Sequence, residues 1–270
     1  MSGNENKDFS ENLEENLTED VKERVAKRIA HLGYCSRREA EKLIREKKVK
    51  VNNVFITTAA LLVCKADKIS ILGKVLKTGG KSKLYAYYKP TGLVCSNQDE
   101  KGRPTIFDDI YQNEKLERVV YVGRLDLNSE GLLLLTNNGE ISKILSSPNL
   151  GLKRVYKVRA FGHVQQNALE ELAMGIMIGG VEYRPILANI IKQSNNNVWI
   201  EFKINEGKNR EIRNICEHLG LQVNRLIRTG FGPYLLEGMQ ESEIIEVDIN
   251  KLKGVIPKIN FEELIKIVKE

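Results

Sequence analysis

GRLDLNSEGLLLLT, residues 123–136, places one carboxylate, Asp126, ahead of four consecutive leucines. The preceding segment, RVVYVG, has the composition of a strand that ends at Gly123, and GLLLLT has that of a second strand. Residues 124–130 are therefore predicted to form a loop at the edge of a sheet, beside apolar side chains that exclude water. A carboxylate there either pairs with Arg124 to fasten the loop or is reactive. Taken alone, the spacing favours the pair.

The pattern on both sides of this loop predicts an α+β domain over residues 84–255. Strand-like alternation is present in KLYAYYK, KRVYKVRAFG and NVWIEFKI, and helical spacing in ISKILSS, NALEELAMG and NREIRNICEHLG. Strands in succession with few helices between them imply a mixed, mainly antiparallel sheet with flanking helices. We expect residues 256–270 to form a helical tail.

Charge is distributed unevenly along the 270 residues, which carry a formal net charge of +6. Residues 1–20 contain seven acids and one base, so they carry −6 and the rest of the chain carries +12. The acidic, asparagine-rich start has almost no apolar residues and is predicted to be a disordered tail. The basic remainder predicts a polyanionic partner, for which nucleic acid is the usual candidate.

Other features of the sequence bear on its location. No apolar run reaches the roughly 18–20 residues that a membrane span needs, and the first residues lack the basic and apolar regions of a secretory signal. The cysteines are far apart with no CxxC pair, which predicts reduced structural thiols; they are Cys35, Cys64, Cys95 and Cys216. We therefore expect a cytoplasmic protein with no membrane partner.

Residues 21–80 have the pattern of a small basic module, with eleven Lys/Arg against four Glu in the first thirty. VKERVAKRIAHLG predicts one helix, and Ser36 with Glu39 forms a capping box that starts a second. Four basic residues lie off the apolar stripe of the second helix, near an N-terminus suited to phosphate binding: Arg37, Arg38, Lys42 and Arg45. Short strands follow, and TGGKSK (78–83) predicts a flexible link.

The two helices, the SRREAEKLI turn and a VxVN strand resemble the alpha-L RNA-binding domain over about residues 25–80. The resemblance implies that the face carrying the four basic residues binds structured RNA. The usual VNG turn is VNN here, and because asparagine tolerates a left-handed φ, we expect the turn to persist at Asn52 and Asn53.

Four segments of the large domain resemble, in their expected order, the motifs of bacterial rRNA pseudouridine synthases that carry an alpha-L domain in front. They are YKPTGLVCSNQDEKGRPTIFD, GRLDLNSEGLLLLTNNGE, GLKRVYKVRAFG and INEGKNREIRNICEHLGLQVNRLIR. Such enzymes cut the bond between uracil and ribose, turn the base and rejoin it through a ring carbon. The family uses no metal, nucleotide or redox cofactor. In agreement, the chain has no P-loop, GxGxxG fingerprint or clustered His/Cys ligands.

The resemblance assigns roles to three residues. Asp126 is the catalytic aspartate, which acts either at the anomeric carbon of the ribose or on the uracil ring. Tyr156 stacks on the uracil, although alternation with Val158 also makes it a packed strand tyrosine. Arg213, at the edge of a helix stripe, pairs with the aspartate and orients it as a carboxylate. Glu130 is expected to be solvent-facing or structural.

A target uridine in folded RNA must leave its stack, which costs a few kcal/mol, so RNA contacts elsewhere have to offset that cost. The basic or polar candidates for contacts to phosphates or flanking bases are Lys89, Arg103, Arg124, Lys208, Asn209 and Arg210. Asn214 interrupts a run that is usually basic, and we expect it to point outward.

Several functions remain open on the sequence. Motif details favour an enzyme for large-subunit rRNA, and a small-subunit rRNA enzyme of the same branch is the alternative. A non-catalytic ribosome assembly factor on an enzyme scaffold is disfavoured because Asp126, Tyr156 and Arg213 are all present. A tRNA substrate is disfavoured by the domain order. The partner is naked rRNA or an assembly intermediate, and we expect a monomer.

Overall fold

The computed structural model describes residues 22–76, 80–113 and 116–269. The predicted acidic tail over residues 1–20 lies outside the described residues, as does part of the predicted link. The chain divides into two compact units, Met1–Gly79 and Gly80–Glu270.

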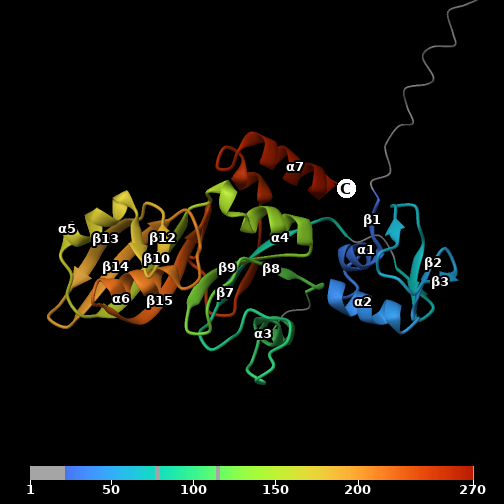
Figure 1. The fold of residues 1–270 in the computed structure, drawn as a ribbon, viewed down its shortest axis with the longest axis horizontal. Coiled ribbons are helices and arrows are strands. Elements are labelled where there is room, and N and C mark those ends of the chain that lie inside the picture. The colour runs from blue at the N-terminus through green and yellow to red at the C-terminus, as the bar shows by residue number, and fades with distance from the viewer. Residues whose placement is uncertain (1–21, 77–79, 114–115, 270) are drawn as a thin grey trace, which may run out of the picture. The chain divides into compact units, whose positions relative to one another are not determined.

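In the small unit, two helices pack against a four-stranded antiparallel sheet (Figure 1). The helices are α1 (Val25–His31) and α2 (Arg37–Arg45), and the sheet has the order β3 (Val54–Phe55), β2 (Val49–Val51), β5 (Ile69–Ile71), β6 (Lys74–Val75). A second, two-stranded pair joins β1 (Glu23–Arg24) to β4 (Leu62–Val63). Ile29, Ile44, Ile69 and Ile71 are fully or almost fully buried between helices and strands.

Two sequence signals of the small unit are confirmed in its local geometry. The hydroxyl of Ser36 accepts a hydrogen bond of 3.1 Å from the backbone N–H of Glu39, so α2 begins where the capping box places it. Asn52 and Asn53 both have positive φ, 48° and 68°, and they make the turn between β2 and β3. The four basic residues of α2 are exposed, as expected.

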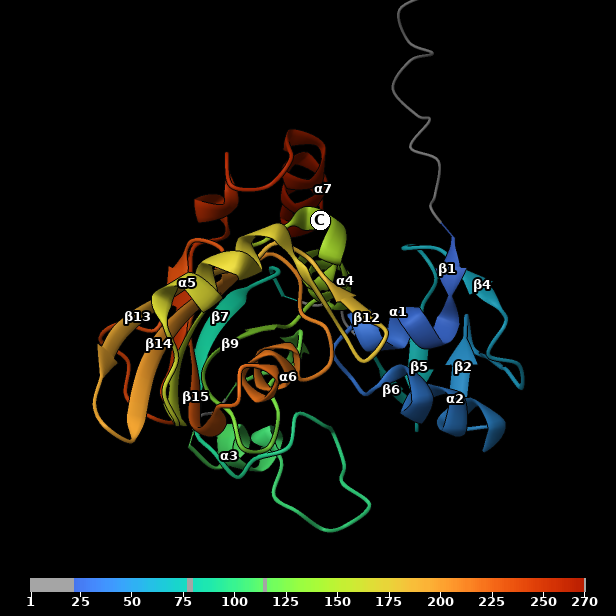
Figure 2. The same cartoon turned by 60° about the vertical axis from the view of Figure 1, so that its left-hand side comes forward.

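The large unit is built on a nine-stranded mixed sheet (Figures 1 and 2). Its main path runs β13 (Leu187–Gln193), β14 (Asn197–Ile204), β10 (Arg154–Phe161), β15 (Gln222–Phe231), β9 (Glu130–Thr136), β7 (Leu84–Lys89), β17 (Ile244–Val247). β8 (Val120–Val122) pairs with β9, and β16 (Tyr234–Leu235) pairs with β15. Every pair of named strands is antiparallel except β9 with β15, so the predicted mixed, mainly antiparallel sheet is confirmed.

The helices pack against this sheet, and the buried side chains between them form two hydrophobic clusters. One cluster packs α5 (Gln166–Glu170) and α6 (Glu211–His218) against β10 and β14. The other packs α4 (Gly139–Ser146) and α7 (Lys258–Lys269) against β7 and β9. Residues beyond 255 therefore share the core of the large unit, since Ile256 and Leu264 are buried in the second cluster.

The remaining elements are short. α3 (Ile106–Asn113) packs its buried Ile106 and Ile110 into the first cluster. A separate hairpin joins β11 (Ile176–Ile178) to β12 (Val181–Tyr183), and 3-10 turns lie at Pro148–Leu150, Glu171–Met174 and Ile249–Leu252. No helix among the described residues is both long and apolar enough to span a membrane.

Candidate active site

The loop that carries Asp126 joins β8 to β9, as the sequence predicts, and is held by its backbone. The N–H of Gly92 donates to the carbonyl of Leu127 at 2.8 Å, and the N–H of Leu125 donates to Sγ of Cys95 at 3.5 Å. Leu125 is 7% exposed and anchors the loop in the hydrophobic cluster, whereas the Asp126 side chain is 42% exposed. The loop thus presents a carboxylate to solvent from a fixed backbone.

Gly131, where this loop enters β9, allows two strands to approach each other closely. It has φ +105° and is paired with Arg228 across the parallel β9–β15 contact. A Cβ at Gly131 would lie 2.9 Å from the backbone nitrogen of Arg228 and closer still to its carbonyl oxygen. Only glycine adopts this positive φ readily and has no Cβ to clash with the backbone of Arg228.

Asp126 is paired with two arginines of the segment that begins α6, and not with Arg124. Its Oδ2 lies 3.8 Å from Nε of Arg213 and 4.0 Å from Nη1 of Arg210. Arg124 is exposed. The structural alternative of an Arg124–Asp126 pair is therefore wrong, and the predicted pairing with Arg213 is seen.

Arg213 reaches Asp126 from a nearly buried position, since its side chain is only 13% exposed. One of its terminal nitrogens donates to the carbonyl of Asn128 at 2.8 Å, so the same guanidinium holds both the loop backbone and the carboxylate. Burial lowers the pKa of Arg213 and the nearby Arg210 lowers it further, while Asp126 opposes the shift. An arginine stays charged under such a shift, so the pair is a fixed electrostatic contact.

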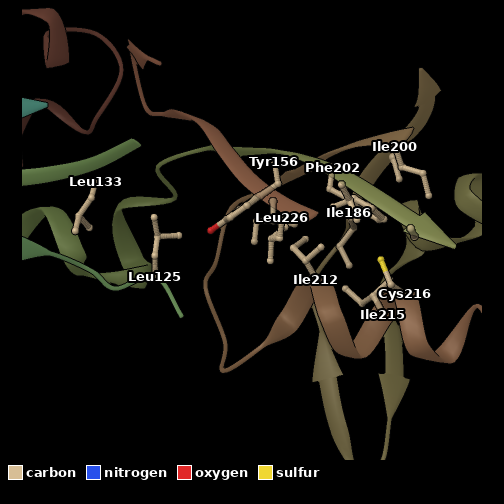
Figure 3. Packing of buried hydrophobic residues seen from close by; sticks show 14 of the residues in the cluster. Leu125, Leu133, Tyr156, Ile186, Ile200, Phe202, Ile212, Ile215, Cys216 and Leu226 are labelled. Carbon is tan, nitrogen blue, oxygen red and sulfur yellow. The ribbon is translucent and has the colours of Figure 1, made fainter. Parts of the chain in front are cut away.

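Tyr156 belongs to the hydrophobic cluster that also holds the chain neighbours of this pair. It is 8% exposed and shares the inward face of β10 with Val158 and Ala160, as alternation predicts. Figure 3 shows its ring extending from the packed side chains toward the segment that carries Leu125. Leu125 and Ile212, the chain neighbours of Asp126 and Arg213, belong to the same cluster as Tyr156. The three candidate catalytic residues therefore come together from a loop, a strand and a helix.

Lys89 was expected to contact RNA, and the structure contradicts this. Lys89 is fully buried, and its ammonium donates to the carbonyls of Pro90 and Ser129, both at 2.8 Å. Burial lowers its pKa, with nearby acids opposing the shift. Lys89 is the last residue of β7, whose other side chains are mostly buried. Its ammonium is therefore inside the protein, where the hydrogen bond to the Ser129 carbonyl holds the end of the Asp126 loop.

Glu130 is buried rather than solvent-facing, so the structural alternative for it holds. Its carboxylate pairs with Nε of Arg225 on β15. The resulting ion pair lies next to the β9–β15 contact and joins the strand after Asp126 to the strand beside Tyr156.

The segment before α6 is fixed by a set of polar contacts. The carboxylate of Glu211 accepts a hydrogen bond of 2.9 Å from the N–H of Lys208, and Arg210 adopts a φ of 52°. Asn214 donates to the Tyr183 hydroxyl at 2.9 Å, so the expectation that it points outward is wrong. Burial raises the pKa of Glu211 to about 7. These contacts set the direction in which Arg210 and Arg213 leave the helix.

Some of the other side chains predicted to contact RNA already have partners within the protein. Arg103 is exposed but forms a two-point hydrogen-bonded ion pair with Asp99. Lys208 donates to the carbonyl of Glu182 and lies 3.2 Å from Glu206. Arg124 and Asn209 are exposed beside the site. Sequence reasoning missed the contact of Arg210 with Asp126, for which the position of Arg210 at the start of a helix near Arg213 is the only signal.

A half-exposed carboxylate oriented by two guanidinium groups, next to a tyrosine ring with an apolar surround, suits attack on an electrophilic carbon of a flat, stackable substrate. Among the described residues, no group of three His, Cys, Asp or Glu side chains is arranged to hold a metal ion.

Comparison with known proteins identifies the class. A family model described as RNA pseudouridylate synthase matches residues 83–218, and a model for the S4 domain matches residues 23–69. The chain belongs to the RNA pseudouridine synthase family: it is an isomerase that acts on RNA, with an S4 domain ahead of the synthase domain.

Individual relatives are similar over most of the chain. An uncharacterized RNA pseudouridine synthase of Rickettsia bellii is 43% identical over 218 residues, covering 81% of this chain and 93% of that protein. Ribosomal large subunit pseudouridine synthase B of Salmonella typhimurium is 36% identical over 241 residues, covering 84% of this chain and 81% of that protein. A solved pseudouridylate synthase aligns with a TM-score of 0.59 at 27% identity, covering 86% of this chain and 99% of that one.

Proposed function

We propose that the protein converts a specific uridine of large-subunit rRNA to pseudouridine, with Asp126 as the reacting carboxylate. The observation that carries the proposal is the contact of Asp126 with Arg213 and Arg210, on a loop held next to Tyr156. Similarity to the large-subunit enzyme of Salmonella typhimurium supports the choice of substrate.

The reaction breaks the bond between N1 of uracil and C1′ of ribose and forms a bond from C5 to C1′. The proton on C5 is lost and N1 gains one, so the reaction needs no co-reactant. Asp126 acts as a nucleophile at C1′ or at the ring, and the arginines orient its charge during either attack.

Tyr156 provides a stacking surface for a uracil that has left the RNA helix. Its ring lies in an apolar surround, and stacking on an aromatic ring recovers part of the cost of extracting the base. The exposed basic residues of α2 in the small unit supply phosphate contacts that offset the rest.

Pseudouridine mapping on purified small- and large-subunit rRNA, after incubation with the protein or with Asp126→Ala, tests the proposal. The expected result is a new site on large-subunit rRNA that the variant does not produce. A site on small-subunit rRNA alone would keep the chemistry and overturn the substrate. RNA binding with no new site on either RNA would favour a binding role in ribosome assembly.

A further inference from the structure

One face of the half-sheet formed by β13, β14, β10 and β15 is open to solvent (Figures 1 and 2). In β10 the inward residues are buried against the cluster of α5 and α6, whereas Val155, Lys157, Arg159 and Phe161 on the other face are half-buried or exposed. β14 alternates in the same way. We call this solvent-accessible side of the four strands the open face.

A row of four side chains crosses the open face. Trp199 of β14 is paired with Lys192 of β13 on one side and with Arg159 of β10 on the other, and Arg159 is paired with Arg225 of β15. Four strands at about 4.7–4.9 Å spacing make this row about 14 Å long. An indole thus lies between two cations, with a third at the end of the row.

The charges of this row are largely unneutralised. Among the described residues, no ion pair involves Arg159, Lys192 or their neighbour Lys157, and all three are exposed. Arg225 is paired with the buried Glu130, and Lys203 is paired with Glu201. Trp199 is half-buried. A sheet face that combines an accessible aromatic ring with free cations has the chemistry of a single-stranded nucleic acid platform.

We propose that the open face binds a single-stranded segment of RNA, with one base stacked on Trp199 and the flanking phosphates held by Arg159 and Lys192. A second copy of the chain does not fit this face equally well, because it would bring the same free cations against each other. RNA carries the complementary charge and offers flat bases to the indole.

The bound segment is distinct from the one that carries the target uridine. Tyr156 and Val158 point to the inner face of β10, whereas Lys157 and Arg159 point to the open face. The two surfaces lie on opposite sides of one sheet, so RNA has to pass around the sheet to occupy both. The inference rests on RNA as the ligand of this enzyme and is independent of which uridine is modified.

The chain contains a single tryptophan, so its intrinsic fluorescence reports on Trp199 directly. We would titrate the full-length protein with a single-stranded oligouridylate while following tryptophan emission, and measure binding in parallel from the anisotropy of the labelled oligonucleotide. The expected result is quenching whose midpoint coincides with the binding curve. Trp199→Ala should weaken binding of the oligonucleotide about 5- to 150-fold.

A pair of double variants with equal charge loss provides the control. Arg159→Gln with Lys192→Gln should reduce the slope of log affinity against log salt by about 1.4, as expected for two lost phosphate contacts on a single strand. Lys251→Gln with Lys266→Gln, exposed residues outside the open face, should leave the quenching unchanged.

Three results would overturn the inference. The first is anisotropy-detected binding with no change in emission, and the second is equal loss in both double variants. The third is emission that depends on protein concentration without RNA, which would assign the face to contacts between copies. Pseudouridine formation on rRNA, measured with the same variants, separates the two proposals. Activity without quenching by RNA would overturn the binding role of the open face but not the proposed reaction. Quenching without activity would overturn the proposed reaction but not the binding role of the open face.

Discussion

Replacing Gly131 by alanine tests whether the close contact of β9 with β15 holds the Asp126 loop. The added Cβ would meet the backbone of Arg228 at less than ordinary contact distance, at a residue with φ +105°. Arg228 cannot move easily, because it is fully buried and its Nε donates to the carbonyl of Leu132 at 2.7 Å. The strands must therefore separate or distort.

The magnitude follows from two costs. A left-handed φ in a residue with a Cβ costs about 1–2 kcal/mol, and forcing extra volume into a packed site costs about 1–3 kcal/mol. Gly131→Ala should thus lower the free energy of unfolding by about 2–5 kcal/mol. Gly123→Ala is the matched control: its φ is +67° and a Cβ there meets nothing within 4 Å, so it should lose only about 1–2 kcal/mol.

The assays are urea unfolding and single-turnover pseudouridine formation at saturating RNA. A displacement of about 1 Å in a reacting group costs on the order of 100-fold in rate. Gly131→Ala should therefore form pseudouridine more slowly than wild type even without urea, under conditions in which the variant is folded. Equal stability of the two alanine variants, or a wild-type rate in Gly131→Ala, would refute the claim that this contact positions Asp126.

Three further predictions concern other parts of the molecule. Arg213→Lys should lower the single-turnover rate at least about 100-fold with little change in RNA affinity, since one ammonium cannot replace a planar guanidinium that holds both Asp126 and a loop carbonyl; a near-wild-type rate would contradict this role. Burial raises the pKa of Glu211 from 4.5 to about 7, so the folded protein favours the protonated carboxyl. The folded state therefore keeps its full stability below about pH 4.5 and loses part of it as the pH rises through 7 and the buried carboxyl ionises. Glu211→Gln should therefore gain stability relative to wild type by about 3 kcal/mol between those pH values in urea unfolding, whereas a pH-independent difference would rule this out. Arg37→Gln with Arg38→Gln should weaken RNA binding and reduce its salt dependence while leaving the rate at saturating RNA unchanged, and a fall in that rate would show that the small unit takes part in catalysis.

Much of the site could be predicted because its residues follow local rules. Period-two alternation placed Tyr156 on the buried face of its strand, and helical spacing placed Arg213 at the edge of its stripe, where it reaches Asp126. The strand–loop–strand pattern around Asp126 needed only residues 118–136.

The errors concern side chains whose surroundings come from distant segments. Lys89 looked like a surface cation, but one of the two carbonyls that its ammonium binds belongs to Ser129, forty residues away. Asn214 turns inward because the Tyr183 hydroxyl is within 2.9 Å. For Glu130 the sequence left a solvent-facing and a structural role open, and the structural one holds because Arg225 lies on the adjacent strand. No spacing rule within a single segment carries this information.

The partners of Asp126 show the same limit. Arg124 is two residues away in sequence, but the arginines that contact the carboxylate are at the start of α6, Arg210 just before it and Arg213 within it. Sequence proximity suggested the wrong partner, and the family motifs supplied the right one.

The most direct test of the account is single-turnover conversion of the mapped rRNA by Asp126→Asn, with RNA affinity measured on the same preparation. Asparagine keeps the size of the side chain but carries no charge to pair with Arg213 and is not a nucleophilic carboxylate. We expect a rate loss greater than about 1,000-fold, comparable to removal of other catalytic nucleophiles, with RNA affinity unchanged within a few-fold. Pseudouridine formation by Asp126→Asn within about 10-fold of wild type would contradict the assignment of Asp126 as the reacting group.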